Sequence, residues 1–200
     1  MAFDATAVYA GRSMIIYSAP FDDTNDFPAK TVDYGTAWGA PWVDRGYTQD
    51  GAEWEISHDF SDIEVDQELS AILTIPSGQN AIMRTSLAEF TAVNIVAGVG
   101  QGAVDATEVP ASGSRGVILY ELTGDILENL YSWGMDFKKN DDSLPLRAAL
   151  WRGKPIGAMA ATFGVADANA RIPVEIRGYP DTSVSPSRVM TIQEILPALA

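Results

Sequence analysis

The sequence predicts a mainly β protein: a β-sandwich or barrel packed against one α-helix, with extended arms and loops. Short segments rich in Val, Ile, Tyr and Trp recur along the chain between turn residues, as in sandwiches and barrels. A single segment combines a helix-start signal with an apolar run. Apolar residues make up 46% of the 200 residues and charged residues 20%, which indicates a folded domain rather than a disordered chain.

One domain is predicted to span residues 1–200. Residues 1–41 are expected to form an N-terminal arm and a loop. Within them, Val8–Ser18 is rich in Tyr, Ile and Val, which favours a strand, and residues 19–41 are a long irregular stretch, which inside a compact domain is usually functional or an extended arm. Residues 42–181 are expected to hold the sandwich core, and residues 182–200 a C-terminal tail.

The segment from Ala52 to Phe60 alternates in the manner of a half-buried strand. The positions predicted to face the core are Ala52, Trp54, Ile56, His58 and Phe60. The positions on the opposite face include the carboxylates Glu53, Glu55 and Asp59. An acidic run follows this strand and contains Asp62, Glu64, Asp66, Gln67 and Glu68. The sequence therefore predicts one acidic sheet face that continues into an acidic loop.

A helix is predicted over about 87–97. Ser86 and Glu89 have the spacing of a capping box, in which each side chain bonds the other's backbone amide. Gly98 would follow the last helical turn, where glycine is favoured. Later strands are expected over 116–122, 145–151 and 171–179, the last of which alternates with Ile172, Val174 and Ile176 on the core side.

The composition excludes several classes of function. The formal net charge of −14 argues against binding to a phosphate backbone or to an anionic membrane surface. The chain has no cysteine and one histidine, His58, so thiol catalysis and multi-histidine metal sites are excluded. Glu53, Glu55 and Asp59 are neighbours on one strand rather than an opposed pair flanking a cleft. We therefore predict no catalytic, cofactor-binding or metal-binding residue.

Several segments, in this order and spacing, resemble the major tail tube proteins of long-tailed bacteriophages with flexible, non-contractile tails. The matching segments are Ile16–Pro20, Trp42–Gly51, Ile63–Gln67, Leu87–Thr91 with Asn94, and, more weakly, Ile172–Ile176 with Gly178–Asp181. Trp42–Gly51 is among the most specific of these. The chain departs from the family at Arg45, where an apolar residue is common, and over residues 103–145.

This resemblance implies a structural virion protein with no enzymatic activity. Six copies would form a ring around a continuous β-barrel, and stacked rings would form a tail tube assembled in the host bacterial cytoplasm. Partners would be other copies of the chain and tail proteins such as the tape measure and the terminator. DNA would pass through without specific binding, and no membrane would be involved. The acidic run from Asp62 to Glu68 would become an inter-subunit loop.

Glu53, Glu55 and Asp59 would then be candidates for the lumen, where negative charge would repel DNA during genome ejection. A second explanation of the acidity is solubility before assembly. Two other identities stay open from the sequence: a ring protein of a related injection or secretion tube, and an acidic carbohydrate-binding β-sandwich module.

Overall fold

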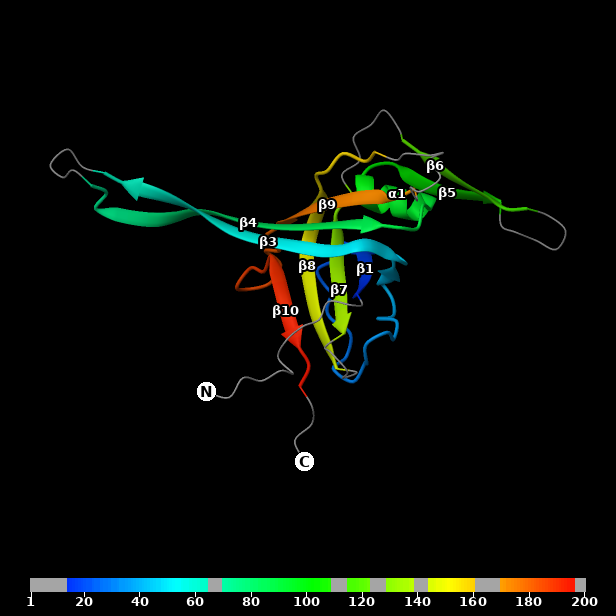
Figure 1. Ribbon diagram of the computed structural model, residues 1–200, viewed down its shortest axis with the longest axis horizontal. Helices are drawn as coiled ribbons and strands as arrows, with labels where there is room; N and C mark the ends of the chain where they lie inside the picture. Colours follow the sequence, from blue (N-terminus) through cyan, green and yellow to red (C-terminus); the bar gives the residue numbers. More distant parts are fainter. Residues whose placement is uncertain are drawn as a thin grey trace.

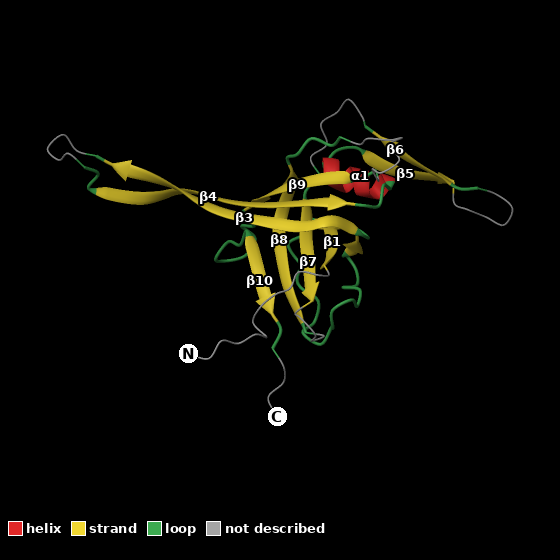
Figure 2. Cartoon of the chain, viewed as in Figure 1, coloured by secondary structure: helices red, strands yellow, loops and turns green. Residues whose placement is uncertain are grey.

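A computed structural model describes residues 14–64, 70–108, 115–122, 129–138, 144–160 and 170–196, with side chains for all of these except 103–108. Within these ranges the chain forms ten strands and one helix (Figure 2). They are β1 (Met14–Pro20), β2 (Val43–Asp44), β3 (Thr48–Ile63), β4 (Leu73–Leu87), α1 (Ala92–Val99), β5 (Ala103–Glu108), β6 (Val117–Glu121), β7 (Tyr131–Lys138), β8 (Pro145–Pro155), β9 (Ile172–Tyr179) and β10 (Met190–Glu194). The predicted mainly β fold with one helix is confirmed.

One strand, β8, is shared by two layers. Its first part pairs with β7 and β10, and its last residues, Arg152–Pro155, pair with β9. The first layer is therefore β2-β1-β7-β8-β10, and the second is β8-β9-β4-β3; every pairing is antiparallel. The strands of the two layers cross steeply in Figure 1. Trp54 of β3 joins the layers, because its indole nitrogen lies 2.9 Å from Met135 Sδ and its ring meets Phe137 edge-on.

The main core lies between the two layers and under α1. Alternate residues of β4 and β9 point into it, as the pleat requires. Its fully or almost fully buried members are Ile16, Ala81, Met83, Leu87, Ala97, Trp133, Met135, Ala148, Leu150, Ile172, Val174 and Ile176. The helix approaches β9 so closely that a Cβ at Gly98 would lie 3.0 Å from Ile172 and 3.2 Å from Val174. The α1 backbone can reach this distance because Gly98 has no side chain.

A second core covers the other face of the first layer. Tyr17, Ala149 and Trp151 on the strands are buried against Trp38 and Trp42 from the stretch between β1 and β2. The Trp38 ring stacks on Tyr17 at 4.6 Å between centroids and occupies the space that a side chain at Gly134 would need. We call residues 21–42 the loop layer.

The expected N-terminal arm therefore needs correction over its described part. β1 is an interior strand between β2 and β7, with Ile16 fully buried. The expected C-terminal tail is also partly wrong, because β10 is hydrogen-bonded to β8 and Ile195 is buried. In both segments, tertiary pairing orders short apolar stretches whose local pattern is weak.

The helix starts later than the sequence predicts. Ser86 and Leu87 belong to β4, where Leu87 pairs with both Thr48 and Ile172 and is fully buried. The N-cap is Thr91, whose hydroxyl accepts a hydrogen bond from the Asn94 amide at 3.2 Å. The Ser86–Glu89 capping box is thus wrong, because strand pairing and burial of Leu87 outweigh a local signal worth about 1 kcal/mol.

A buried ion pair ties the loop layer to the first sheet. Arg147 of β8 and Asp136 of β7 are fully buried, with Arg147 Nε 3.7 Å from Asp136 Oδ1. Arg147 Nη1 donates to the carbonyl oxygens of Pro28 and Ala29, both at 3.3 Å, and Nη2 donates to that of Val32. Neither Asp136 oxygen has a hydrogen-bond partner among the described residues. Burial raises the pKa of the Asp136 carboxyl to about 6, although Arg147 opposes this shift.

This pKa predicts a pH-dependent stability. Between pH 3.8 and about 6, folded Asp136 holds a proton that the unfolded chain has lost. The stabilisation of the folded state by the Asp136 carboxyl is therefore fully present at low pH and is lost as the pH rises through about 6. We expect the unfolding free energy of the wild type to fall over this window, relative to Asp136→Asn, by on the order of 2 kcal/mol. Urea unfolding of both proteins at matched pH values measures the difference, and parallel pH profiles would contradict it.

Candidate assembly surfaces

The β3–β4 hairpin projects far beyond the sandwich (Figure 1). β4 pairs with β9 only from Ala81 onward, so the backbones of the more distal strand residues pair only with each other among the described residues, and the Asn80 side chain accepts a hydrogen bond from Arg177 of β9. We call residues 56–64 and 70–80 the arm. Its register shifts once, between Asp59 and Phe60, where Gly78 and Pro76 lie opposite. Residues 65–69 at its tip lie outside the described residues.

The arm exposes large apolar side chains. Phe60 is 63% exposed and Ile56 50%. Others on the arm are Ile63, Ile72, Leu73 and Ile75. The prediction that Ile56, His58 and Phe60 face the core is therefore wrong: of that alternating set, only Ala52 and Trp54 pack against it. The alternation is real, but the sandwich ends near Trp54, and no other element in the described part of the chain covers either face of the arm.

The acidic residues expected in a loop are on the arm. Asp62 is the next-to-last residue of β3 and accepts a hydrogen bond from the Thr74 hydroxyl at 2.6 Å. Glu64 follows directly and is exposed. The remaining members of this set, Asp66, Gln67 and Glu68, fall outside the described residues. Between Gly46 and Met83 the sequence contains no Lys or Arg. The arm therefore combines exposed apolar side chains with carboxylates and carries no Lys or Arg.

Glu53, Glu55 and Asp59 do share one exposed face of the second layer, which we call the outer face. Arg84 of β4 lies among the carboxylates there: Nη1 is 2.8 Å from Glu55 and Nε is 3.0 Å from Glu175 of β9. These contacts raise the pKa of Arg84, the bond to Glu55 most. Farther out, the Asn80 amide donates to Asp59 at 3.3 Å.

The same face carries cations that the sequence pattern did not reveal. Lys154 of β8 lies directly opposite Arg177 of β9, and Arg152 lies opposite Tyr179. We call Arg152, Lys154 and Arg177 the cation row. With Arg84 they equal in number the carboxylates Glu53, Glu55, Asp59 and Glu175. Acidic charge is therefore concentrated on β3 and basic charge on β8 and β9, with Arg84 between them.

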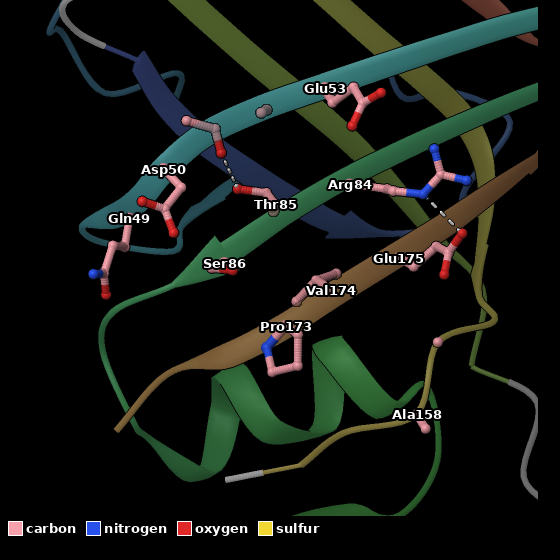
Figure 3. Close-up of a pocket in the computed structure, with 13 residues that line it drawn as sticks. Gln49, Asp50, Glu53, Arg84, Thr85, Ser86, Ala158, Pro173, Val174 and Glu175 are labelled. Atoms are coloured by element: carbon pink, nitrogen blue, oxygen red, sulfur yellow. Dashed lines mark hydrogen bonds and ion pairs between the residues drawn. The ribbon is translucent and has the colours of Figure 1, made fainter. Parts of the chain in front are cut away.

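An open hollow lies on this side of the molecule (Figure 3). It is bordered by the start of β3, the end of β4, the start of β9 and the segment after β8. Asp50 at its rim has a positive φ of 67° and pairs with Arg171 at 2.9 Å. Thr85 donates to the Gly51 carbonyl oxygen at 2.9 Å. The polar side chains at the rim are therefore largely paired within the chain.

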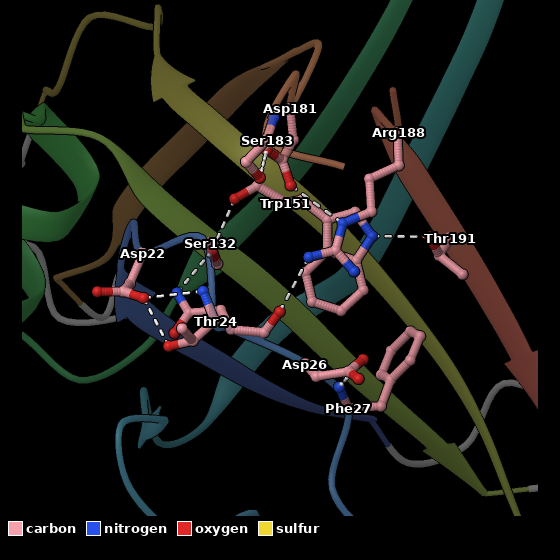
Figure 4. Close-up of polar contacts among 11 residues, drawn as sticks. Asp22, Thr24, Asp26, Phe27, Ser132, Trp151, Asp181, Ser183, Arg188 and Thr191 are labelled. Carbon is pink, nitrogen blue, oxygen red and sulfur yellow. Dashed lines mark hydrogen bonds and ion pairs between the residues drawn. The ribbon is translucent and has the colours of Figure 1, made fainter. Parts of the chain in front are cut away.

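The loop layer presents a second acidic surface. Its charged members are Asp22, Asp23, Asp26, Lys30 and Asp33. Asn25 anchors it by donating to the Pro20 carbonyl oxygen at 2.8 Å and to Ser132 Oγ at 2.9 Å (Figure 4). Arg188 donates to the Asn25 carbonyl oxygen at 3.0 Å, pairs with Asp181 at 3.1 Å and lies over the Trp151 ring at 3.8 Å. This network fixes the loop layer on the first sheet.

The segment after β2 turns sharply at Gly46, which has a φ of 76°. A Cβ there would overlap the carboxylate of Glu89, which accepts a hydrogen bond from the Tyr47 amide at 3.2 Å. The side-chain amide of Asn94 donates a hydrogen bond to the Arg45 carbonyl oxygen at 3.1 Å. Arg45 itself is buried, with Nε 2.8 Å from Ser18 Oγ, and burial lowers its pKa. Glu89 therefore supports this turn rather than capping a helix.

A shorter ribbon, β5 paired with β6, contacts α1. It extends from the sandwich on the side opposite the arm (Figure 1). Val117, Ile118 and Leu119 of β6 are exposed. The predicted strand over 116–122 is confirmed as β6, whereas the Gly, Ala and Ser content of residues 101–116 predicts a loop where the structure has β5.

No protein-family model matches this chain, and no curated protein matches it. Among the described residues, no group of three or more His, Cys, Asp or Glu side chains is arranged to hold a metal ion. In the same part of the chain, no helix has the length and apolarity needed to cross a membrane.

Substitution of Gly46 tests whether Glu89 stabilises the turn at this residue. Gly46 and Gly35 both have positive φ, but only Gly46 would place a Cβ on another group. Each Gly→Ala change incurs backbone strain of about 1–2 kcal/mol. We expect Gly46→Ala to lose about 1 kcal/mol more, because Glu89 must move and release the Tyr47 amide. Chemical denaturation of both variants, alone and with Glu89→Ala, measures this excess, which should vanish without Glu89. An excess that survives Glu89→Ala would contradict the assignment.

Proposed function

We propose that this chain is the major tail tube subunit of a bacteriophage with a long, non-contractile tail. In this proposal, six copies form a ring, rings stack into a tube, and the tube conducts the genome out of the capsid. The chain acts as a structural protein and not as an enzyme. The observation that carries the proposal is the arm, a long hairpin that no other described element covers on either face.

Physical considerations support an assembled state. Exposed apolar side chains on a projecting hairpin are a liability in a monomer and are normal in an interface. β3 is an edge strand of 16 residues whose outer side pairs with nothing in the described part of the chain. Such an edge is a template for pairing with another chain. A contact between two different surfaces of identical subunits closes into rings or extends into filaments.

The two other identities inferred from the sequence explain less. The hollow beside β9 does not suit a carbohydrate, because its polar groups are largely paired and its lining residues include no exposed aromatic side chain. A carbohydrate-binding module also has no use for an apolar arm. A ring protein of a related injection or secretion tube would use the same arm. Abundance in the virion separates the two ring proteins, because a tube is built from many copies.

Electron microscopy of the purified protein tests the proposal directly. We expect negative-stain images to show six-fold rings and tubes at concentrations where self-association is complete. A variant in which residues 60–76 are replaced by a short Gly-containing turn should remain folded but stay monomeric, because the sandwich core ends near Trp54. A wild type that remains a monomer at all accessible concentrations would refute the proposal.

The outer face provides a second test, of the conduit itself. If it lines the lumen, Glu53→Lys with Glu55→Lys adds two cations per subunit along the DNA path. Virions with this double variant should eject their genome slowly at low salt and normally at high salt, because phosphate contacts weaken as salt rises. Asp22→Lys with Asp23→Lys in the loop layer makes the same charge change and is the control. Normal ejection by the outer-face variant at both salt concentrations would place this face outside the lumen.

A further inference from the structure

One two-residue step of β3 lies outside the strand pairing. The register with β4 shifts between Gln49 and Ala52, so the intervening Asp50 and Gly51 form a bulge. Both have a left-handed backbone, with a φ of 67° at Asp50 and 76° at Gly51. Asp50 is the only residue other than glycine with a positive φ in the described part of the chain. The peptide bond between these two residues therefore has no directly opposed residue on β4.

The same step has the chemistry of an aspartate that reacts with its own backbone. The amide nitrogen of the next residue can attack the side-chain carboxyl carbon and close a five-membered succinimide ring, and glycine hinders this attack least because it has no side chain. The Asp50 side chain is 70% exposed. Apart from the adjoining residues, nothing described lies within 4 Å of the point that a Cβ at Gly51 would occupy. The sequence contains no other Asp–Gly step and no Asn–Gly step.

We propose that Asp50–Gly51 is a modification site at which the folded chain converts aspartate to isoaspartate without an enzyme. The Gly51 nitrogen bonds to Asp50 Cγ and gives up its proton, and the protonated carboxyl loses its hydroxyl, so that one water is released. Water then adds to the backbone carbonyl carbon of Asp50 and breaks the bond from this carbon to the Gly51 nitrogen. The chain now runs through Cβ, and the former backbone carbonyl becomes a carboxyl group. The second step consumes one water, so the conversion needs no co-reactant.

Arg171, just before β9, restrains this reaction. Its Nη1 lies 2.9 Å from Asp50 Oδ2. Asp50 itself lies at the rim of the hollow beside β9 (Figure 3). A paired carboxylate is a poor electrophile, so Asp50 must leave Arg171 and take up a proton before the ring can close. Arg171 is half-exposed, and solvent weakens such a pair, so the pair slows the reaction without preventing it.

The bulge lets the folded subunit accommodate the product. Isoaspartate adds one atom to the backbone, and the step between Gln49 and Ala52 has no paired residue for that atom to displace. The Thr85 hydroxyl, which donates to the Gly51 carbonyl oxygen at 2.9 Å, holds the far end of the step. A left-handed φ is no longer required at residue 50, because the chain gains a rotatable bond through Cβ. This chemistry needs only the subunit and occurs whether or not the chain assembles.

Peptide mapping of the full-length folded protein tests the inference. The protein is incubated at mildly acidic pH, below its unfolding temperature, in water enriched in heavy oxygen. Electron-transfer fragmentation of its peptides distinguishes isoaspartate from aspartate. We expect isoaspartate at residue 50 with heavy oxygen incorporated, preceded by a peptide lighter by one water. Asp59 and Asp62 of the same strand are exposed but precede Phe60 and Ile63, and they should remain unmodified.

Variants separate the roles of the three residues. Arg171→Gln should accelerate the conversion several-fold, whereas Arg171→Lys, which retains the charge, should stay near the wild-type rate. Gly51→Ala should slow it, because a methyl group beside the nitrogen hinders attack. Asp50→Asn is the positive control, since its side chain forms the same succinimide by releasing ammonia. Unfolding midpoints verify that each variant is folded.

The outcomes are decisive for each part of the inference. A wild type without isoaspartate at residue 50, under conditions in which Asp50→Asn has reacted, would overturn the modification site. Isoaspartate without heavy oxygen would overturn the succinimide route. Equal rates in the wild type and Arg171→Gln would overturn the restraint. If Arg171→Gln does not fold, the wild type at high salt replaces it, because salt screens this exposed pair and should accelerate the conversion.

Discussion

Strand β8 is the constraint on which the two layers depend. Because its first part bonds to β7 and β10 and its last residues bond to β9, neither layer can be completed without it. Its side chains serve three environments: Leu150 lies in the main core, Arg147 and Trp151 lie under the loop layer, and Lys154 lies on the outer face. Position along this one strand therefore couples core packing, loop anchoring and surface charge.

The sandwich buries its apolar side chains within the subunit, whereas the arm leaves its apolar side chains exposed. Behind Trp54, each apolar side of β4 and β9 meets the first layer or α1. Beyond Trp54, strands β3 and β4 continue with apolar side chains on both faces and no covering element among the described residues. A monomeric sandwich has no physical reason to extend a hairpin in this way. On the proposed function, self-association would give this extension a role.

The sequence predicted what depends on strong local alternation. The half-buried pattern of β9, the class of the fold and the shared face of Glu53, Glu55 and Asp59 all follow from the two-residue repeat of a strand. Prediction from the sequence failed where tertiary contacts determine the local structure. The Ser86–Glu89 spacing suits a helix start, but burial of Leu87 keeps it in a strand. The cation row was missed because Arg152, Lys154 and Arg177 lie in separate segments and meet only through β8–β9 pairing.

Arg147 has a consequence for the order in which the chain folds. It bonds to carbonyl oxygens of residues 28–32, more than a hundred positions earlier in the sequence. Contacts this distant in sequence close late, because the loop entropy must be overcome before they contribute. We expect the loop layer to close last, so that Tyr17 and Trp151 remain exposed while the sheets form. During that interval, newly made subunits expose a large aromatic surface. Aggregation then competes with folding, and the outcome depends on whether Arg147 bonds to the loop layer before two incompletely folded chains collide.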